Sequence, residues 1–220
     1  MIGRQIHSIE ATLPEGVELV AVSKFHPVEA LREAYDAGQR IFGESRVQEL
    51  VEKMALLPGD IRWHFIGHLQ TNKAKALIGR TALIESVDSV RLLELIDRLS
   101  TEAAVETRVL LQVHVAREET KFGFAPDELL DYFRSGSYKS LRATRLRGLM
   151  GMATNTDDTT RIRADFHAIS QLFNQIRSIC PDLTEFNTLS MGMSDDYPIA
   201  IEEGSNLVRV GTAIFGERSY

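Results

Sequence analysis

The chain has 220 residues, 44% of them hydrophobic and 25% charged, which is the balance of an ordinary globular protein. The formal net charge of -6 disfavours a nucleic-acid-binding protein, which would need a basic surface. A single cysteine excludes an intramolecular disulfide, no apolar run approaches the ~20 residues of a membrane span, and the N-terminus lacks the apolar core of a signal peptide. We therefore expect a soluble, cytoplasmic monomer that folds as one domain over residues 1–220.

Short β-branched runs alternate with helical stretches along the chain. A leading helix is predicted from the spacing of Ile2, Ile6, Ile9 and Leu13, before the break at residues 14–16. The runs that are typical of strands cover residues 17–23, 40–43, 61–66, 82–87, 109–115, 146–150, 184–189 and 207–210. The helical stretches between them cover residues 27–38, 47–57, 69–78, 90–99, a segment that starts at 126, 161–179 and 199–203.

This strict alternation of strands and helices predicts right-handed βαβ units and a parallel sheet. A doubly wound open sheet uses the same pattern, but eight units in a chain of this length favour closure into a barrel. The strands are short and continuously apolar, as expected where helices cover the outer face of a sheet. The sequence thus predicts an α/β fold, a single (β/α)8 TIM-type barrel with an extra N-terminal helix.

Lys24 stands where such a barrel has its active site, at the C-terminal end of the first strand. It follows the apolar run 19–22, so its ammonium group is expected at the mouth of a desolvated barrel. Desolvation lowers the pKa of a lysine and frees its amine to attack an aldehyde. The other interpretation of the spacing is a strand-end lysine that makes a salt bridge.

Two segments of small residues follow the last two predicted strands: the loop 190–194, and Gly211 with Thr212. The loops after strands seven and eight are the usual phosphate site of these barrels. Glycine lets the backbone approach an anion, and hydroxyl and N–H groups donate hydrogen bonds to it. Each segment alone is also typical of a simple turn. Their common location, with Arg209 and Lys24 at the same rim, indicates a pocket for a phosphate and a carbonyl group.

The other chemically active residues favour structural roles. His64 and His68 are four residues apart, but they straddle the end of a strand and lack the glutamate of a metalloprotease helix between them. Cys180 lies late in a predicted helix with no evident catalytic partner, which favours a buried structural residue. We therefore predict no metal site.

Five longer runs occur in the order that one family shows. They are residues 20–24 (VAVSK), 63–73 (WHFIGHLQTNK), 146–150 (LRGLM), 189–194 (LSMGMS) and 208–216 (VRVGTAIFG). Together they resemble the pyridoxal phosphate homeostasis protein family, over about residues 19–218. The resemblance implies a single-domain barrel similar to the N-terminal domain of bacterial alanine racemase. It also implies binding of pyridoxal 5′-phosphate (PLP), with no catalytic turnover established for the family.

The resemblance assigns roles to individual residues. Lys24 matches the lysine that forms the Schiff base with PLP, and Arg209 matches the arginine that faces the pyridine nitrogen. The positions that match phosphate-binding residues are Ser190, Ser194, Gly211 and Thr212.

Three positions depart from the family pattern. Ser45 stands where an asparagine usually follows Phe-Gly-Glu, so a ring contact from that position is in question. His26 stands where a lysine is common, and His114 stands where the family often has asparagine.

We expect cofactor carriage instead of catalysis. PLP enzymes strengthen the electron sink with an acidic partner for the pyridine nitrogen, whereas an arginine only donates and leaves that nitrogen unprotonated. Alanine racemases manage with a similar arginine, but they add a tyrosine base from a separate domain, for which we expect no counterpart in 220 residues. The expected partners are PLP and, as recipients, PLP-dependent apoenzymes. The alternatives are a PLP-dependent amino-acid racemase or transaminase, a Schiff-base aldolase on the same barrel, and a regulator whose partner surface matters more than its ligand.

Overall fold

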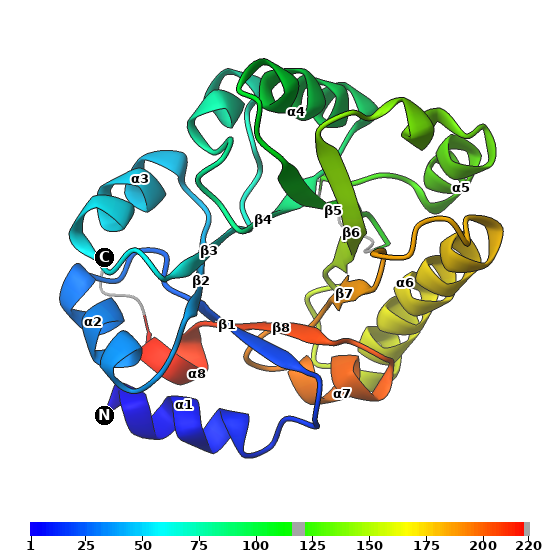
Figure 1. The fold of residues 1–220 in the computed structure, drawn as a ribbon. Coiled ribbons are helices and arrows are strands. Elements are labelled where there is room, and N and C mark those ends of the chain that lie inside the picture. The colour runs from blue at the N-terminus through cyan, green and yellow to red at the C-terminus, as the bar shows by residue number, and fades with distance from the viewer. Residues whose placement is uncertain (116–121, 218–220) are drawn as a thin grey trace.

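The computed structural model describes residues 1–115 and 122–217. Within these ranges, eight parallel strands form a closed barrel in which each strand pairs with the next and β8 pairs with β1 (Figure 1). The strands are β1 (Glu18–Val22), β2 (Ile41–Glu44), β3 (Arg62–Phe65), β4 (Leu83–Val87), β5 (Thr107–Val113), β6 (Thr144–Gly151), β7 (Thr188–Ser190) and β8 (Leu207–Val210). The predicted barrel is confirmed.

Helices surround the barrel and cover its outer face (Figure 1). They are α1 (Ile2–Glu10), α2 (Val28–Asp36), α3 (Val47–Leu56), η1 (Thr71–Ala76), α4 (Val90–Glu102), α5 (Pro126–Arg134), η2 (Ser137–Ser140), α6 (Thr159–Ile179), α7 (Tyr197–Glu202) and α8 (Thr212–Phe215), where η marks a 3-10 helix. The leading helix α1 packs against α2 and α8, so the predicted extra helix belongs to this outer layer. Among the residues described, no helix is long and apolar enough to cross a membrane.

The alternation of side chains along each strand decides what reaches the inside of the barrel. Leu19 and Ala21 of β1 join the large apolar cluster between the strands and the helices, whereas Val20 belongs to a second, smaller cluster. That smaller cluster takes one residue from each of six strands: Val20, Ile41, Leu83, Leu110, Met150 and Leu207. The next inward positions on β1 and β8 are Val22 and Arg209, which therefore lie at the rim of the barrel.

Local sequence signals set several helix ends. Asp158 precedes α6, and its carboxylate accepts hydrogen bonds from the backbone N–H groups of Thr160 and Arg161, as an N-cap residue does. Gly38 has a φ of +107°, which lets the chain leave α2 through a turn that favours glycine. Pro126 occupies the first turn of α5, where its missing N–H costs nothing.

Apart from small shifts at element ends, the structure differs from the predicted elements in four places. The helix predicted at 69–78 is only the 3-10 helix η1, because Thr71 and Asn72 favour local turns and Gly79, with a φ of +69°, ends the segment. The strand predicted at 184–189 is the shorter β7, because backbone hydrogen bonds hold the residues before it in turns. The helices η2 and α8 were not predicted, since four residues are too few to leave a periodic pattern.

Candidate functional site

A cavity of about 190 Å³ opens at the C-terminal ends of the barrel strands. Its wall is formed by the last residues of β1, β6 and β8 and by the segments that follow β1, β3, β6, β7 and β8. The lining residues are Val22, Lys24, His26, Ile66, Met150, Met152, Met193, Ser194, Asp195, Arg209, Gly211 and Thr212. The structure therefore brings together five of the six residues that the sequence singled out, all except Ser190.

Lys24 follows the end of β1 by two residues and reaches the same cavity as Val22, the last residue of that strand. The strand ends at Val22, the following Ser23 is fully buried, and Lys24 itself is half-buried. Val22 and Ile66 add apolar wall to the same cavity. The lysine side chain thus stands at the boundary between an apolar wall and solvent.

A buried polar network supports Arg209 from inside the barrel. Arg209 donates through Nη1 to Ser190 Oγ at 2.5 Å and through Nη2 to the Gly151 carbonyl oxygen at 3.0 Å. The Ser190 hydroxyl donates to Glu85 Oε2 at 2.6 Å, and His64 Nδ1 donates to Glu85 Oε1 at 2.7 Å. Glu85 Oε2 also lies 3.9 Å from Arg209 Nη1, so the guanidinium has a buried counter-ion. We call His64, Glu85, Ser190 and Arg209 the inner network.

Glu85 and Arg209 both stay charged within the inner network. Burial alone would raise the pKa of Glu85, but the hydrogen bond from His64 and the charges of His64 and Arg209 hold that pKa below its usual value. Burial lowers the pKa of Arg209 and the Glu85 charge opposes the shift. Because a guanidinium stays protonated in proteins, Arg209 remains a cation, and it presents only hydrogen-bond donors to the cavity.

Two members of the inner network differ from what the sequence indicated. The Ser190 hydroxyl is fully buried between Arg209 and Glu85 and lies outside the cavity lining, so the geometry gives its predicted phosphate contact no support. Glu85 was missed at the sequence level. The signal was there, because a glutamate between Ile84 and Ser86 in a buried strand must find a partner for its charge.

The other end of the cavity is formed by the loop after β7 and the first turn of α8. The Ser194 hydroxyl oxygen accepts hydrogen bonds from the backbone N–H groups of Gly211 and Ala213, both at 3.3 Å. Two N–H groups that converge on one oxygen are suited to holding an anionic oxygen. A Cβ atom at Gly211 would come within 3.2 Å of the Val22 carbonyl oxygen, so glycine lets β8 and β1 lie close here. Thr212, exposed at the start of α8, completes this end.

The tyrosines of the described ranges lie away from the cavity. Tyr197 follows the loop after β7, but its hydroxyl pairs with the Thr12 hydroxyl at 3.2 Å and the residue is not part of the lining. The remaining tyrosines in these ranges, also outside the lining, are Tyr35, Tyr132 and Tyr138. Tyr220 lies outside the described residues.

His26 is the position of family departure that enters the cavity. Its ring stacks on Phe215 with 4.9 Å between the ring centroids, and the residue lines the wall beside Lys24. Ser45 lies in the wall of a different hollow, beside α3. His114 is half-buried at the end of β5, and its backbone N–H donates to the Phe124 carbonyl oxygen.

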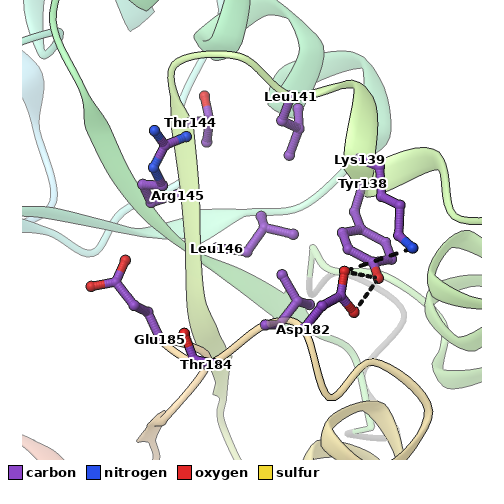
Figure 2. Close-up of a pocket in the computed structure, with 10 residues that line it drawn as sticks. Tyr138, Lys139, Leu141, Thr144, Arg145, Leu146, Asp182, Thr184 and Glu185 are labelled. Carbon is purple, nitrogen blue, oxygen red and sulfur yellow. Dashed lines mark hydrogen bonds and ion pairs between the residues drawn. The ribbon is translucent and has the colours of Figure 1, made fainter.

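A larger hollow of about 360 Å³ lies at the opposite end of the barrel, where β6 begins (Figure 2). In Figure 2 the Tyr138 hydroxyl and the Lys139 ammonium both point to Asp182, with distances of 2.8 and 3.7 Å. Across the hollow, Arg145 forms an ion pair with Glu106 at 3.0 Å. Glu185, also in the lining, forms an ion pair with Arg147 at 2.7 Å, so the charged side chains of this hollow already have partners within the protein. In parallel barrels functional residues gather at the C-terminal ends of the strands, so we assign the candidate site to the smaller cavity.

Comparison with known proteins places the chain in a family. The family model of the alanine racemase N-terminal domain matches residues 2–219. Alanine racemase from E. faecalis has the same fold, with a TM-score of 0.75 at 19% identity, although 98% of this chain covers only 57% of that one.

Closer relatives match at nearly full length. The pyridoxal phosphate homeostasis protein of Pasteurella multocida is 39% identical over 97% of this chain and 93% of its own length. The protein of the same name from Schizosaccharomyces pombe is 40% identical over 92% of this chain and 84% of its own. The structure of PipY from Synechococcus elongatus with PLP bound superposes with a TM-score of 0.91 at 38% identity, covering 98% of this chain and all of that one. The chain therefore belongs to the alanine racemase N-terminal domain family and, with these relatives, to the pyridoxal phosphate homeostasis proteins.

Proposed function

We propose that this protein holds PLP in the rim cavity as a Schiff base on Lys24, and that it carries or sequesters the cofactor in intracellular PLP homeostasis without turning over a substrate. The observation that carries the proposal is the convergence on one cavity of Lys24, Arg209 and the first turn of α8. The names of the relatives and the PLP bound to PipY support it.

The residues present fit the three functional ends of PLP. A primary amine suits the aldehyde, and Lys24 is the lysine of the lining. A phosphate suits the N–H groups of Gly211 and Ala213, with the Ser194 and Thr212 hydroxyls beside them. The ring nitrogen is a hydrogen-bond acceptor when unprotonated, and Arg209 is a buried donor fixed by the inner network. Metal ions are not needed for any of these contacts.

When bound, PLP supplies an aldehyde that reacts with amines and a ring that withdraws electrons. Arg209 limits the second property, because a guanidinium cannot transfer a proton near neutral pH and so favours the unprotonated ring nitrogen. The nearest carboxylate in the inner network, Glu85, is engaged by His64 and Ser190 and has a lowered pKa. Neither residue acts as the acid that would strengthen the ring as an electron sink.

An amino-acid racemase is the alternative function, and the geometry of the cavity limits which residues could transfer the protons. Racemisation needs proton removal on one face of the substrate and delivery on the other, each step worth ~10²–10⁴-fold in rate. Tyr197, the tyrosine nearest the rim in the sequence, is bonded to Thr12 instead. Apart from Lys24, the acid–base side chains of the lining are His26 and Asp195. Among the described residues of the lining, these two are the side chains that could serve a racemase as the second acid–base group.

We infer that the protein acts as a monomer. The proposal extends to PLP-dependent apoenzymes as recipients of the bound cofactor. Mixing loaded protein with an apoenzyme of this class, in the presence of a trap for free PLP, tests the extension. Activation that matches the rate of spontaneous PLP release would contradict direct transfer.

The absorbance spectrum of the protein titrated with PLP tests binding and attachment. We expect a visible band that hydroxylamine bleaches, because hydroxylamine competes with the lysine amine for the aldehyde. Lys24→Ala should lose the band and keep the fold, since Lys24 lies at the cavity and outside the apolar clusters. A band of normal intensity in the Lys24→Ala protein would contradict the proposal.

Loss of α-deuterium from labelled alanine tests the absence of turnover. The PLP-loaded protein should show no sustained exchange above that of free PLP. Tyr197→Phe serves as a control for a residue outside the lining, and His26→Gln for one inside it. Exchange that is fast in the native protein and disappears in both Lys24→Ala and His26→Gln would establish the racemase alternative.

A further inference from the structure

A second buried polar network lies outside the barrel, between the ends of β1 and β2 and the helix α3. Lys53 of α3 is 5% exposed, and its Nζ lies 2.7 Å from Glu44 Oε1 and 2.7 Å from Glu49 Oε1. The same Nζ donates to the Ser23 carbonyl oxygen at 2.8 Å, so all three ammonium donors are used. The Ser23 hydroxyl donates to Glu44 Oε1 at 2.6 Å. We call Ser23, Glu44, Glu49 and Lys53 the outer network.

The outer network forms hydrogen bonds with the backbone on both sides of Lys24. On one side, Lys53 holds the carbonyl group of Ser23. On the other side, the backbone N–H of Phe25 donates to Glu49 Oε1 at 2.7 Å. Glu49 and Lys53 are four residues apart on α3 and form an ion pair with each other. One turn of one helix therefore fixes the residue before Lys24 and the residue after it.

The segment held in this way is conformationally unusual. Phe25 has a φ of +67°, in the left-handed region that residues other than glycine seldom adopt. Such strain persists where the surrounding contacts over-determine the conformation, and it gathers at functional sites. The contacts on Phe25 include the Glu49 hydrogen bond and the Arg46 guanidinium, which lies 4.5 Å from the centre of the phenyl ring.

Stability alone is a poor reason for this arrangement. A buried ion pair gives up hydration that its mutual attraction only partly restores, and apolar residues of similar size often serve a fold as well or better. The outer network is also incomplete, since Glu44 Oε2 is buried without a hydrogen-bond partner among the residues described. What these charges do achieve is to fix the short segment that carries Lys24.

We propose that Glu49 and Lys53 are positioning residues, which hold the backbone around Lys24 so that its amine meets the aldehyde of PLP at the correct distance and angle. The inference rests on the proposed function, because it needs Lys24 to be the attachment point. It adds two residues of α3 that do not line the cavity.

The test separates covalent attachment from non-covalent binding. PLP measures both, whereas pyridoxine 5′-phosphate, which has an alcohol in place of the aldehyde, measures the non-covalent part alone. In Glu49→Leu we expect the equilibrium constant of covalent attachment to fall about tenfold, the factor that one charge-assisted hydrogen bond supplies. Affinity for pyridoxine 5′-phosphate should stay within about twofold of the native value, because the cavity contacts remain.

Three further variants test whether the lost hydrogen bond to Phe25 causes the loss of attachment in Glu49→Leu. Glu49→Gln keeps an oxygen that accepts from the Phe25 N–H, so it should recover most of the attachment. Glu52→Ala removes an exposed carboxylate from the same helix and should change neither ligand. Lys53→Met should resemble Glu49→Leu. If Lys53→Met fails to fold, the partly exposed Glu49 still carries the test.

Two outcomes overturn the positioning role: unchanged attachment in Glu49→Leu, or an equal loss of both ligands. Failure of the proposed function is distinguishable from either, because it would appear in the native protein as no attachment to Lys24. A readout without PLP completes the design. Hydrogen exchange at the Phe25 amide should speed up about tenfold in Glu49→Leu but not in Glu52→Ala. Equal exchange rates of the Phe25 amide in both variants would contradict the proposal that Glu49 holds Phe25.

Discussion

Glu85 and Glu44 are both fully buried, and both belong to networks next to a cavity residue, yet their pKa values shift in opposite directions. Glu85, inside the barrel, uses both oxygens, one toward His64 and one toward Ser190. Glu44, between the barrel and α3, has both of its hydrogen bonds on Oε1. Burial raises the pKa of Glu44 more than the Lys53 charge lowers it, whereas the partners of Glu85 outweigh burial.

The difference follows from what each network delivers to the cavity. The inner network supplies a positive charge at the cavity, which is the guanidinium of Arg209. Glu85, a carboxylate with both oxygens hydrogen-bonded, stabilises that charge and holds the guanidinium in place through Ser190. The outer network delivers a conformation: its contacts end on the backbone at Ser23 and Phe25, and no member of it lines the cavity. A carboxylate that only needs to hold a backbone segment tolerates incomplete bonding.

The largest effect is expected from removing the inner charge. Arg209→Gln removes the buried cation beside Glu85 Oε2 and leaves that carboxylate with His64 and Ser190 as its partners. Breaking a buried ion pair in this way costs about 3–5 kcal/mol of unfolding free energy. Urea denaturation measures the change. Arg147→Gln is the control, because its pair with Glu185 is partly exposed and contributes at most about 1 kcal/mol. Similar losses of unfolding free energy in the two variants would mean that the inner network does not stabilise the buried charges of Glu85 and Arg209.

A smaller effect, on PLP affinity, is expected from Thr212, which lies at the rim of the cavity and belongs to neither network. Thr212→Ala should weaken PLP by about 1.5–3 kcal/mol, the value of a hydrogen bond to a charged group, and should leave pyridoxal nearly unchanged. Thr212 is exposed, so stability should not change. Parallel titrations with the two ligands make the comparison. Equal weakening of both would place the phosphate elsewhere.

The smallest effect concerns pH and carries opposite signs for the two carboxylates. The folded pKa of Glu85 is below its usual 4.5, so its contribution to stability is present above that pH and is lost as pH falls through the folded pKa. The folded pKa of Glu44 is above 4.5, so its contribution is full below that pH and is lost as pH rises through the folded pKa. Each slope is limited to about 1.4 kcal/mol per pH unit.

Unfolding free energies measured across this range reveal the two slopes. Glu85→Gln should lose less stability than the native protein when the pH falls below 4.5. Glu44→Gln should lose less when the pH rises above 4.5. If both substitutions reduce the pH dependence of the unfolding free energy on the same side of pH 4.5, the opposite pKa shifts of Glu85 and Glu44 are wrong.

Much of the fold was predictable because it rests on repeated local patterns. Eight short apolar runs in alternation with helices leave few topologies, and the barrel is among them. What failed was local: the 3-10 helix at Thr71–Ala76 and the late start of β7 depend on turn hydrogen bonds that no periodicity records. The four-residue α8 falls below the length of any helical pattern.

The placement of residues in the candidate site was predictable where the end of a strand positions a residue directly. Lys24, Arg209, Ser194, Gly211 and Thr212 follow from the rule that parallel strands point their C-terminal ends at one rim. The partners behind them were not predictable, because a hydrogen bond between distant segments has no signature in either segment. Ser190 and Glu85 are 105 positions apart in the chain. Lys53 did leave a trace, as a charge on the face of α3 that also carries the buried Leu50.

The most direct test of the account is to reduce the PLP-loaded protein with borohydride and to locate the pyridoxyl group by mass spectrometry of its peptides. The account predicts one dominant adduct, on Lys24. An adduct spread over exposed lysines, or found mainly at Lys73 in η1, would contradict it, because the cavity, the inner network and the outer network all derive their roles from that one amine.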